Sequence, residues 1–163
     1  MHSSEHFKPR FVHRESVRPE WVDYNGHMNV AYYVLVFDHA TDATLDQLGI
    51  GEAYRLDSGC SVFVGEMHVN YLREVVAGDE LHVATRLLAT DEKRLVMFHE
   101  MMCPPPARVV ASNEVLCVHV DLGLTRGDGP TPSPRCCAAP SPTRRISPAR
   151  AQRAGSASHS SGS

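Results

Sequence analysis

The spacing of apolar and polar residues predicts one long helix in the first third of the chain. From Asn29 to Leu48, apolar side chains recur every three or four residues, which places them on one face of an α-helix. Asn29 is a residue type that caps helix N-termini, and Gly49 is one that ends helices. The pattern therefore predicts a helix over residues 29–48, whose packed face is formed by Val30, Val34, Phe37, Thr41, Leu45 and Leu48.

The segments on either side of this helix have the shorter period of β-strands. Residues 10–18 form a first strand-like run, which Pro19 ends because proline cannot donate to a strand ladder. After a loop beyond the helix, four more runs follow, joined by hairpin-sized links with turn residues. The expected class is α+β, a five-stranded antiparallel sheet packed on one long central helix. The four later runs cover residues 61–72, 80–90, 94–103 and 109–121.

One helix cannot cover both faces and both edges of such a sheet. An uncovered sheet face and an open edge strand are surfaces that a second copy of the chain can bury. The pattern therefore favours a homodimer or homotetramer over a monomer.

Composition divides the chain into two unlike parts. Residues 123–163 hold six Pro, eight Ser and six Arg but no aromatic residue, so they lack the apolar surface needed to offset the entropy of ordering. We expect a folded domain over residues 8–122 and a disordered tail over residues 123–163. The folded part holds all but two of the 19 acidic residues, which argues against a nucleic-acid-binding surface.

The chain has no sequence feature of membrane insertion or secretion. No apolar run approaches the roughly 18 residues of a membrane-spanning helix. The first residues also lack the apolar stretch of a secretory signal. We therefore expect a cytoplasmic protein without a membrane partner.

The loop from Trp21 to Asn29 carries the most informative chemistry. It places the carboxylate of Asp23 and the imidazole of His27 directly before the predicted helix, whose first N–H groups and dipole favour negative charge. A carboxylate beside such donors can attack a carbonyl, or activate water against it, while the donors stabilise the oxygen. An Asp three residues before Gly26 is also a common turn residue. His27 is either a general acid–base group or a structural imidazole bonded to the loop.

The segment Asp23-Tyr-Asn-Gly-His27-Met-Asn29, in its strand–loop–helix setting, resembles the hotdog-fold acyl-CoA thioesterases, specifically the 4-hydroxybenzoyl-CoA thioesterase-like group. The resemblance covers about residues 12–121. Residues 17–33 look closest to thioesterase domains that occur alone or fused to carnitine dehydrogenases, some of which act on betainyl-CoA. The resemblance implies hydrolysis of an acyl-CoA to a carboxylate and CoA. CoA is then part of the substrate, and no metal or redox cofactor is needed.

The resemblance also assigns roles to single residues. It makes Asp23 the catalytic carboxylate, either as nucleophile or as general base, with His27 beside it in a mainly supporting role. Backbone N–H groups near His27 and Met28 would form the oxyanion hole. The remaining positions are Gly26 and Asn29 in the loop and Tyr32, which would line the acyl pocket.

Polar residues on the later strands are weaker candidates. Glu66, His68 and Asn70 alternate along one strand and so share a face. That face is either solvated or part of a polar site near a partner subunit's pocket, which makes Glu66 and His68 candidates for substrate binding. Cations at strand ends and turns could contact the phosphates of CoA, or simply be solvated; they are Arg73, Lys93 and Arg94.

Two other groups of residues have a possible role besides packing. His82, His99 and His119 lie on different expected strands without paired ligand spacing, so we expect no metal site from them. The aromatic residues either fill the core or form a cage for a quaternary ammonium group; most of them are Trp21, Tyr24, Tyr32, Tyr33, Phe63 and Tyr71.

Two other functions fit the same pattern. A hotdog-fold dehydratase or hydratase would use a histidine with a carboxylate for proton transfer at carbon, and Asp23 with His27 could supply that pair. A non-catalytic acyl-CoA-binding protein would keep the pocket without turnover. The setting of Asp23 and His27 is closer to the thioesterase loop.

Overall fold

The computed structural model describes residues 11–106 and 108–125. Among these residues, no helix combines the length and the apolar character needed to cross a bilayer. The expected disordered tail lies outside the described residues from position 126 onward, and its first residues belong to a short helix. The elements are β1 (Phe11–Ser16), the short 3₁₀ turn η1 (Pro19–Trp21), α1 (Val30–Leu48), α2 (Glu52–Ser58), β2 (Cys60–Tyr71), β3 (Glu80–Thr90), β4 (Arg94–Cys103), β5 (Arg108–Asp121) and α3 (Leu122–Thr125).

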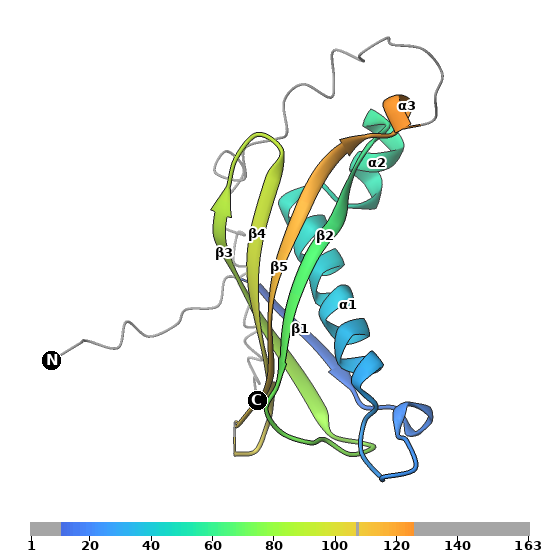
Figure 1. The fold of residues 1–163 in the computed structure, drawn as a ribbon, viewed down its shortest axis with the longest axis vertical. Coiled ribbons are helices and arrows are strands. Elements are labelled where there is room, and N and C mark those ends of the chain that lie inside the picture. Colours follow the sequence, from blue (N-terminus) through green and yellow to red (C-terminus); the bar gives the residue numbers. More distant parts are fainter. Residues whose placement is uncertain (1–10, 107, 126–163) are drawn as a thin grey trace, which may run out of the picture.

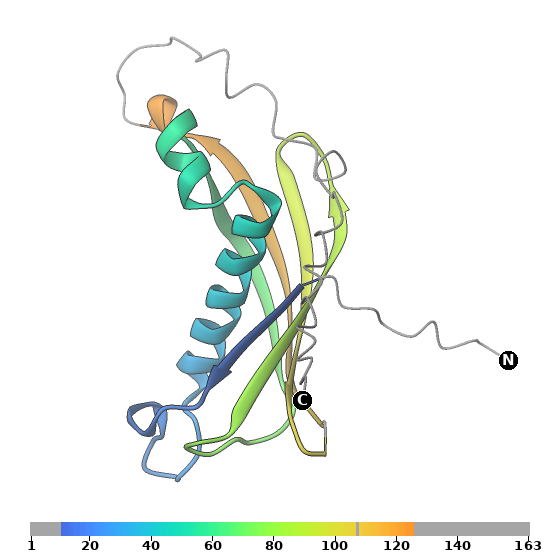
Figure 2. The same cartoon turned by 180° about the vertical axis from the view of Figure 1, so that it is seen from behind.

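The strands form one antiparallel sheet with the order β1-β3-β4-β5-β2. The sheet curves around α1, which lies along its concave face (Figure 1), and β1 crosses beside the helix on the same side (Figure 2). The expected α+β class, with five antiparallel strands around one long helix, is confirmed. β1 and β2 are the two edge strands, so the sheet does not close on itself.

The ends of α1 are fixed by the residues that the sequence indicates. The Asn29 side chain accepts a hydrogen bond from the Ala31 N–H at 3.0 Å, which satisfies one free donor of the first turn. Gly49 ends the helix in the left-handed conformation with φ of 77°, which glycine adopts without steric cost. Both caps are local, which is why the pattern located the helix to within one residue.

The packed face of α1 differs from the expected one at its N-terminal end. Val30 is exposed and Val34 only partly buried, whereas Tyr33 and Val36 are buried against the sheet. The buried positions step by three and four residues from Tyr33, so the stripe is rotated by one position at this end. The apolar side chain of Val30 is thereby left to line a pocket instead of the core.

Helix α2 lies in a segment, residues 49–60, that the sequence predicts to be a loop. None of its residues is buried, so it has no apolar stripe that a periodicity could reveal. Gly59 ends it in the left-handed conformation, with φ of 71°.

A polar layer crosses the core beneath α1. His99 is fully buried, with Nε2 3.1 Å from Thr41 Oγ1 and Nδ1 2.8 Å from Thr85 Oγ1. The Thr41 hydroxyl donates its proton to the Phe37 carbonyl at 2.9 Å, so its oxygen accepts from His99 and places the ring proton on Nε2. Burial lowers the pKa of His99 from 6.5 to about 4. The buried imidazole is therefore neutral at physiological pH.

Asn113, the register partner of His99 on β5, is also fully buried. Its side-chain nitrogen and oxygen have no hydrogen-bond partner within the described part of the chain. An unpaired buried amide of this kind costs about 1–3 kcal/mol per group. Within this polar layer, the ring nitrogens of His99 have hydrogen-bond partners, whereas the side-chain amide of Asn113 has none among the described residues.

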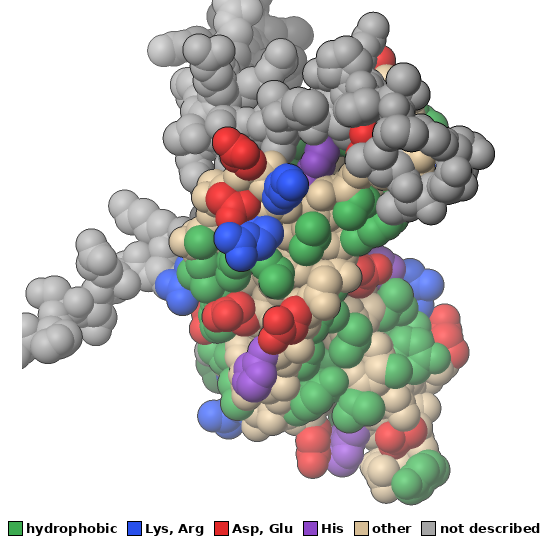
Figure 3. Space-filling view, turned by 45° about the horizontal axis from the view of Figure 1, so that its top comes forward, with side chains coloured by type: hydrophobic (Ala, Val, Ile, Leu, Met, Phe, Trp, Pro, Cys, Tyr) green, Lys and Arg blue, Asp and Glu red, His purple; other side chains and the backbone are tan. Residues whose placement is uncertain are grey.

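The outer surface mixes apolar and charged side chains. On the side seen in Figure 3, hydrophobic side chains lie in groups between scattered acidic and basic ones. The edge strand β2 contributes Phe63, Val64 and Tyr71, each with more than two fifths of its surface exposed. Exposed apolar residues on an open edge mark a surface suited to association.

Candidate active site

The loop between β1 and α1 is held in place from both sides by backbone hydrogen bonds. The Asn29 N–H donates to the Trp21 carbonyl at 2.9 Å, which closes the loop across its base. The Met28 N–H donates to the carbonyl of Val75 at 2.9 Å, which ties the loop to the segment after β2. Trp21 and Met28 are buried, so the loop is anchored by packing at the same two points.

Asp23 begins a tight turn inside this loop. Its Oδ1 accepts from the Asn25 N–H at 2.8 Å, and its carbonyl accepts from the Gly26 N–H at 3.0 Å. Gly26 has φ of 82°, the left-handed conformation that this turn requires. The second carboxylate oxygen of Asp23 has no hydrogen-bond partner among the described residues. One carboxylate oxygen of Asp23 therefore stabilises the turn, as a turn residue would, and the other remains available to react with a substrate or water.

The hydrogen bonds of the loop narrow the set of amides that can stabilise an oxyanion. The N–H groups of Gly26, Met28 and Asn29 each donate to a backbone carbonyl, so they are not available to a substrate in this arrangement. The His27 N–H makes no hydrogen bond within residues 11–106 and 108–125. Of the two amides expected near the oxyanion, Met28 is therefore engaged and His27 is free.

Tyr32 supports the loop and does not line the pocket. Its ring stacks on Trp21 with centroids 5.3 Å apart and an interplanar angle of 13°. The Arg18 guanidinium lies 5.0 Å from the centroid of the Trp21 ring. This stack packs the base of the loop, so the structure gives Tyr32 a different position from the one that the resemblance implies.

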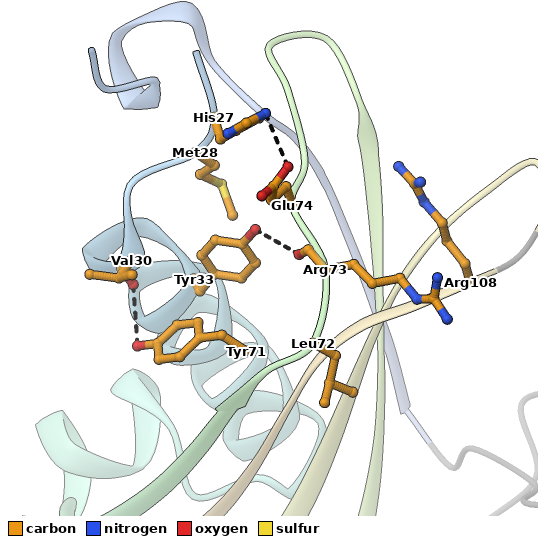
Figure 4. A pocket seen from close by; sticks show the side chains of 9 residues that line it. All are labelled: His27, Met28, Val30, Tyr33, Tyr71, Leu72, Arg73, Glu74 and Arg108. Atoms are coloured by element: carbon orange, nitrogen blue, oxygen red, sulfur yellow. Dashed lines mark hydrogen bonds and ion pairs between the residues drawn. The ribbon is translucent and has the colours of Figure 1, made fainter. Parts of the chain in front are cut away.

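A pocket of about 570 Å³ opens beside the loop, within the size range of small-molecule sites. It lies between the start of α1, the end of β2 and the start of β5 (Figure 4). Its wall is part apolar, part aromatic and part charged, a composition that suits a ligand with an acyl end and a polar end. The lining residues are His27, Met28, Val30, Tyr33, Tyr71, Leu72, Arg73, Glu74 and Arg108.

The two tyrosines form the aromatic part of this wall. The rings of Tyr33 and Tyr71 meet edge to face, with centroids 5.4 Å apart. Tyr33 is buried and its hydroxyl donates to the Arg73 carbonyl at 3.1 Å, whereas the Tyr71 ring is half exposed. The sequence leaves open whether Tyr71 fills the core or belongs to an aromatic cage, and its position at the end of edge strand β2 explains why it is open to the pocket. Tyr24 is 97% exposed and contributes nothing to this wall.

The charged groups lie at two ends of the pocket. His27 Nε2 is 3.1 Å from a carboxylate oxygen of Glu74, which holds the imidazole against the segment after β2. Arg73 and Arg108 extend to the side of the pocket away from Val30 (Figure 4). The pocket therefore has an acidic group near the loop and two guanidinium groups at its outer side.

Several other expected candidates lie outside the pocket. Glu66 and His68 are exposed on edge strand β2, together with Asn70. Arg94 is held by Asp91 in a turn, with 2.8 Å between Arg94 Nε and Asp91 Oδ2. His82, His99 and His119 contact different groups in the structure, which are Glu80, the threonines Thr41 and Thr85, and Tyr54.

Glu74 and Arg108 were not anticipated from the sequence. Glu74 follows Arg73 at the end of β2, so a charged pair at a strand end was a usable signal. Arg108 follows the proline run of residues 104–106, which the pattern reads as a turn, and nothing local connects it to the loop. Both reach the pocket only because β2 and β5 are neighbours in the sheet.

Comparison with known proteins identifies the chain. Residues 17–148 match the model of the thioesterase-like superfamily. The chain belongs to this family. The expected hotdog fold and acyl-CoA thioesterase class are thereby confirmed, and the hydratase and binding-protein alternatives gain no support.

Individual relatives agree with this membership. A betainyl-CoA thioesterase of Pseudomonas aeruginosa is 43% identical over 118 residues, which span 72% of this chain and 71% of the relative. An L-carnitine dehydrogenase/betainyl-CoA thioesterase of Agrobacterium fabrum is 41% identical over 118 residues, but these span only 24% of that protein. A hypothetical protein of Staphylococcus aureus, solved in complex with CoA, superposes with a TM-score of 0.67 at 27% identity, covering 75% of this chain and 76% of that one.

Proposed function

We propose that this thioesterase hydrolyses an acyl-CoA whose acyl group carries a quaternary ammonium, at the pocket beside the Asp23 loop. The observation that carries the proposal is the aromatic and acidic wall of the pocket, which includes His27 and Met28 of the loop that carries Asp23, although Asp23 itself is not among the lining residues. The names of the betainyl-CoA thioesterase relatives support the same acyl class.

The reaction adds water across the thioester. The free oxygen of Asp23 either takes a proton from water as it attacks the carbonyl carbon, or attacks that carbon itself and is released by water afterwards. The carbonyl oxygen becomes an oxyanion, to which the free His27 N–H can donate at the positive end of α1. If water attacks, the C–S bond breaks to give the carboxylate, and the proton held by Asp23 passes to the CoA thiolate. If Asp23 attacks, the C–S bond breaks to release the CoA thiolate and leave an acyl–Asp23 anhydride, which water hydrolyses to the carboxylate and the free Asp23, with its second proton going to the thiolate. His27 keeps the loop in place through Glu74, which fits a supporting role.

The pocket wall suits a cationic acyl group. A quaternary ammonium cannot donate hydrogen bonds, so it is recognised by aromatic faces and by nearby negative charge. Tyr71 offers a half-exposed ring, and Glu74 offers a carboxylate on the same wall. Arg73 and Arg108 at the outer side supply the positive charge that phosphate groups of CoA require.

A pair of isosteric substrates tests this proposal. Betainyl-CoA and 3,3-dimethylbutanoyl-CoA have acyl ends of the same shape, but only the first is charged. We expect a higher kcat/KM for betainyl-CoA, and a loss of about 3- to 10-fold in that preference in Tyr71→Leu, as removal of a cation–π contact predicts. Tyr24→Leu, which removes a fully exposed tyrosine of the loop, should leave the preference unchanged.

The outcomes of this test separate the two parts of the proposal. No release of CoA thiol from any acyl-CoA would overturn the hydrolase. Release at equal rates from the two isosteres would overturn the ammonium substrate alone.

The active assembly is expected to contain at least two copies of the chain. β2 is an edge strand of twelve residues with exposed Phe63 and Val64, and a second β2 can pair with it to extend the sheet. Glu66 and His68 lie on this strand, so pairing would bring them toward the pocket of the other copy. In such a dimer, Glu66 and His68 of one copy could bind the substrate in the pocket of the other copy, although they do not line the pocket of their own copy.

Sedimentation measures this directly. We expect the mass of two or four copies for the wild type and a shift toward one copy for Val64→Lys, which puts a charge on the open edge. Val12→Lys, at a valine of similar exposure on the other edge strand β1, is the matched control. A wild-type protein that sediments as a single copy at micromolar concentration would refute the assembly.

A further inference from the structure

A cluster of three metal-binding side chains lies outside the pocket, between β1 and α1. His13 and Glu15 are two residues apart on β1, so both point to the same face of the strand. His39 comes from the middle of α1, which packs on β1 (Figure 2). Their ligand atoms all lie within 4.8 Å of one another, and among the described residues this is the one such trio.

The distances within the cluster are those of a nearly formed site. His13 Nε2 and His39 Nδ1 lie 3.3 Å and 2.8 Å from the same oxygen, Oε2 of Glu15. Around a zinc ion, with bonds of about 2.0–2.2 Å, neighbouring ligand atoms lie roughly 3.3 Å apart. An ion therefore needs only small side-chain movements to replace the direct contacts between these groups.

The surroundings keep the cluster ordered and accessible. Glu15 has a side-chain exposure of 13%, and the two histidines have 23% and 36%, so the ligands are held by packing but can be reached from solvent. The other oxygen of Glu15 is 3.4 Å from the exposed Arg18 guanidinium, which orients the carboxylate. The set of two imidazoles and one carboxylate suits Zn²⁺ and other first-row divalent ions, and leaves positions for water.

We propose that His13, Glu15 and His39 bind a divalent transition-metal ion such as Zn²⁺ and thereby join edge strand β1 to helix α1. These two elements flank the loop that carries Asp23, one before it and one after it. An ion at this position would fix the spacing of both ends of the loop. It contributes no step to thioester hydrolysis, so the site is independent of the proposed reaction.

The test uses Co²⁺ and Zn²⁺ alone, on the full chain after treatment with a chelator. We expect one equivalent of Co²⁺ to bind with the visible absorption of nitrogen and oxygen ligation, and to be displaced by Zn²⁺. The affinity for this Co²⁺ ion should fall at least about tenfold in His13→Gln, in Glu15→Gln and in His39→Gln. Saturating Zn²⁺ should also raise the thermal midpoint of the wild type by roughly 5 °C, and not that of His39→Gln.

His82→Gln is the matched control. His82 and Glu80 have the same spacing of two residues on a strand, with 3.7 Å between His82 Nε2 and the Glu80 carboxylate, but no third ligand among the residues that the structure describes. If His39→Gln binds the equivalent as tightly as the wild type and His82→Gln, the proposal is overturned. It is also overturned if the wild type shows no saturable binding.

A measurement without variants guards against loss of folding. Imidazole ¹⁵N shifts of the wild type should change on Zn²⁺ addition at two rings, one through Nε2 and one through Nδ1, as His13 and His39 require. Shifts through other nitrogens, or at none, would contradict the site.

Discussion

Asp23→Asn should reduce the kcat for acyl-CoA hydrolysis by about two to four orders of magnitude, the range for loss of a positioned acid–base or nucleophilic group. An asparagine side-chain oxygen can still accept from the Asn25 N–H, so the turn of the loop is kept. What is lost is the basic, negatively charged oxygen that has no hydrogen-bond partner in the part of the chain that the structure describes. We therefore expect KM to change little, and thermal stability to remain near that of the wild type. Release of CoA thiol, followed continuously with a colorimetric reagent, measures both constants.

Asp57→Asn is the matched control for this substitution. Asp57 is an exposed aspartate on α2, and the same chemical change there should leave kcat unaffected. Turnover of Asp23→Asn within a few fold of the wild type would remove Asp23 from the mechanism. The acid would then be a turn residue alone, and another group, with Glu74 the nearest acidic residue of the pocket, would have to activate water.

The free energy of unfolding should fall by about 3 kcal/mol between pH 6.5 and pH 4 because of His99 alone. Burial lowers the pKa of His99 to about 4 in the folded chain, whereas the unfolded chain has the ordinary value of 6.5. Between these values the unfolded state binds the extra proton, so stability rises with pH in this window and is lost as the pH falls. Each pH unit corresponds to about 1.4 kcal/mol. Above pH 6.5 both states are neutral and this contribution is constant.

The groups around His99 explain why the proton is excluded. Thr41 and Thr85 already satisfy both ring nitrogens of the neutral form, and the Phe37 ring lies with its centroid 5.8 Å away. Protonation would bury a charge that none of these neighbours balances. Urea unfolding at several pH values measures the slope, which should flatten in His99→Gln and persist in His82→Gln. Equal slopes for the wild type and His99→Gln would show that His99 does not carry the dependence.

Carboxylates contribute to acid sensitivity in a lower pH range. Burial alone would raise the pKa of Glu15, but hydrogen bonds and charge from His39 and His13 outweigh it and hold the pKa below its usual value. Stability from this group is present above pH 4.5 and is lost as the pH falls through the folded value. The difference between the wild type and His99→Gln therefore isolates the part of the pH dependence of stability that comes from His99, because the contribution of Glu15 is the same in both proteins.

The sequence was most informative where structure depends on neighbours along the chain. The caps of α1 at Asn29 and Gly49, and the strand periods, are set by side chains within a few residues, and each was located closely. Helix α2 is not predictable in this way, because none of its residues is buried and it therefore has no periodic apolar stripe. The sequence does not predict the rotation of the buried face of α1 near Val30, because several neighbouring positions there are apolar and only packing against the sheet selects which of them is buried.

The candidate site was predictable only in part, for the same reason. The turn around Asp23 and Gly26 can be read from local chemistry, and the structure contains it. The pocket wall cannot be read in this way, since Tyr71, Glu74 and Arg108 meet the loop only through the order of strands in the sheet. His39 likewise reaches Glu15 across 24 residues of sequence. The sequence also cannot show that the Met28 N–H is already hydrogen-bonded, because its acceptor, the Val75 carbonyl, is distant along the chain.

The pocket wall and the Asp23 turn come from different segments of the chain. The turn with Asp23 lies on the loop before α1, whereas Tyr71, Arg73 and Glu74 lie at the end of β2, mostly exposed and outside the core. The Met28–Val75 hydrogen bond joins these segments through backbone atoms, so it does not depend on the side chains that line the wall. Selection or engineering can therefore exchange the residues at the end of β2, and with them the acyl preference that we propose, while the Asp23 carboxylate keeps its position.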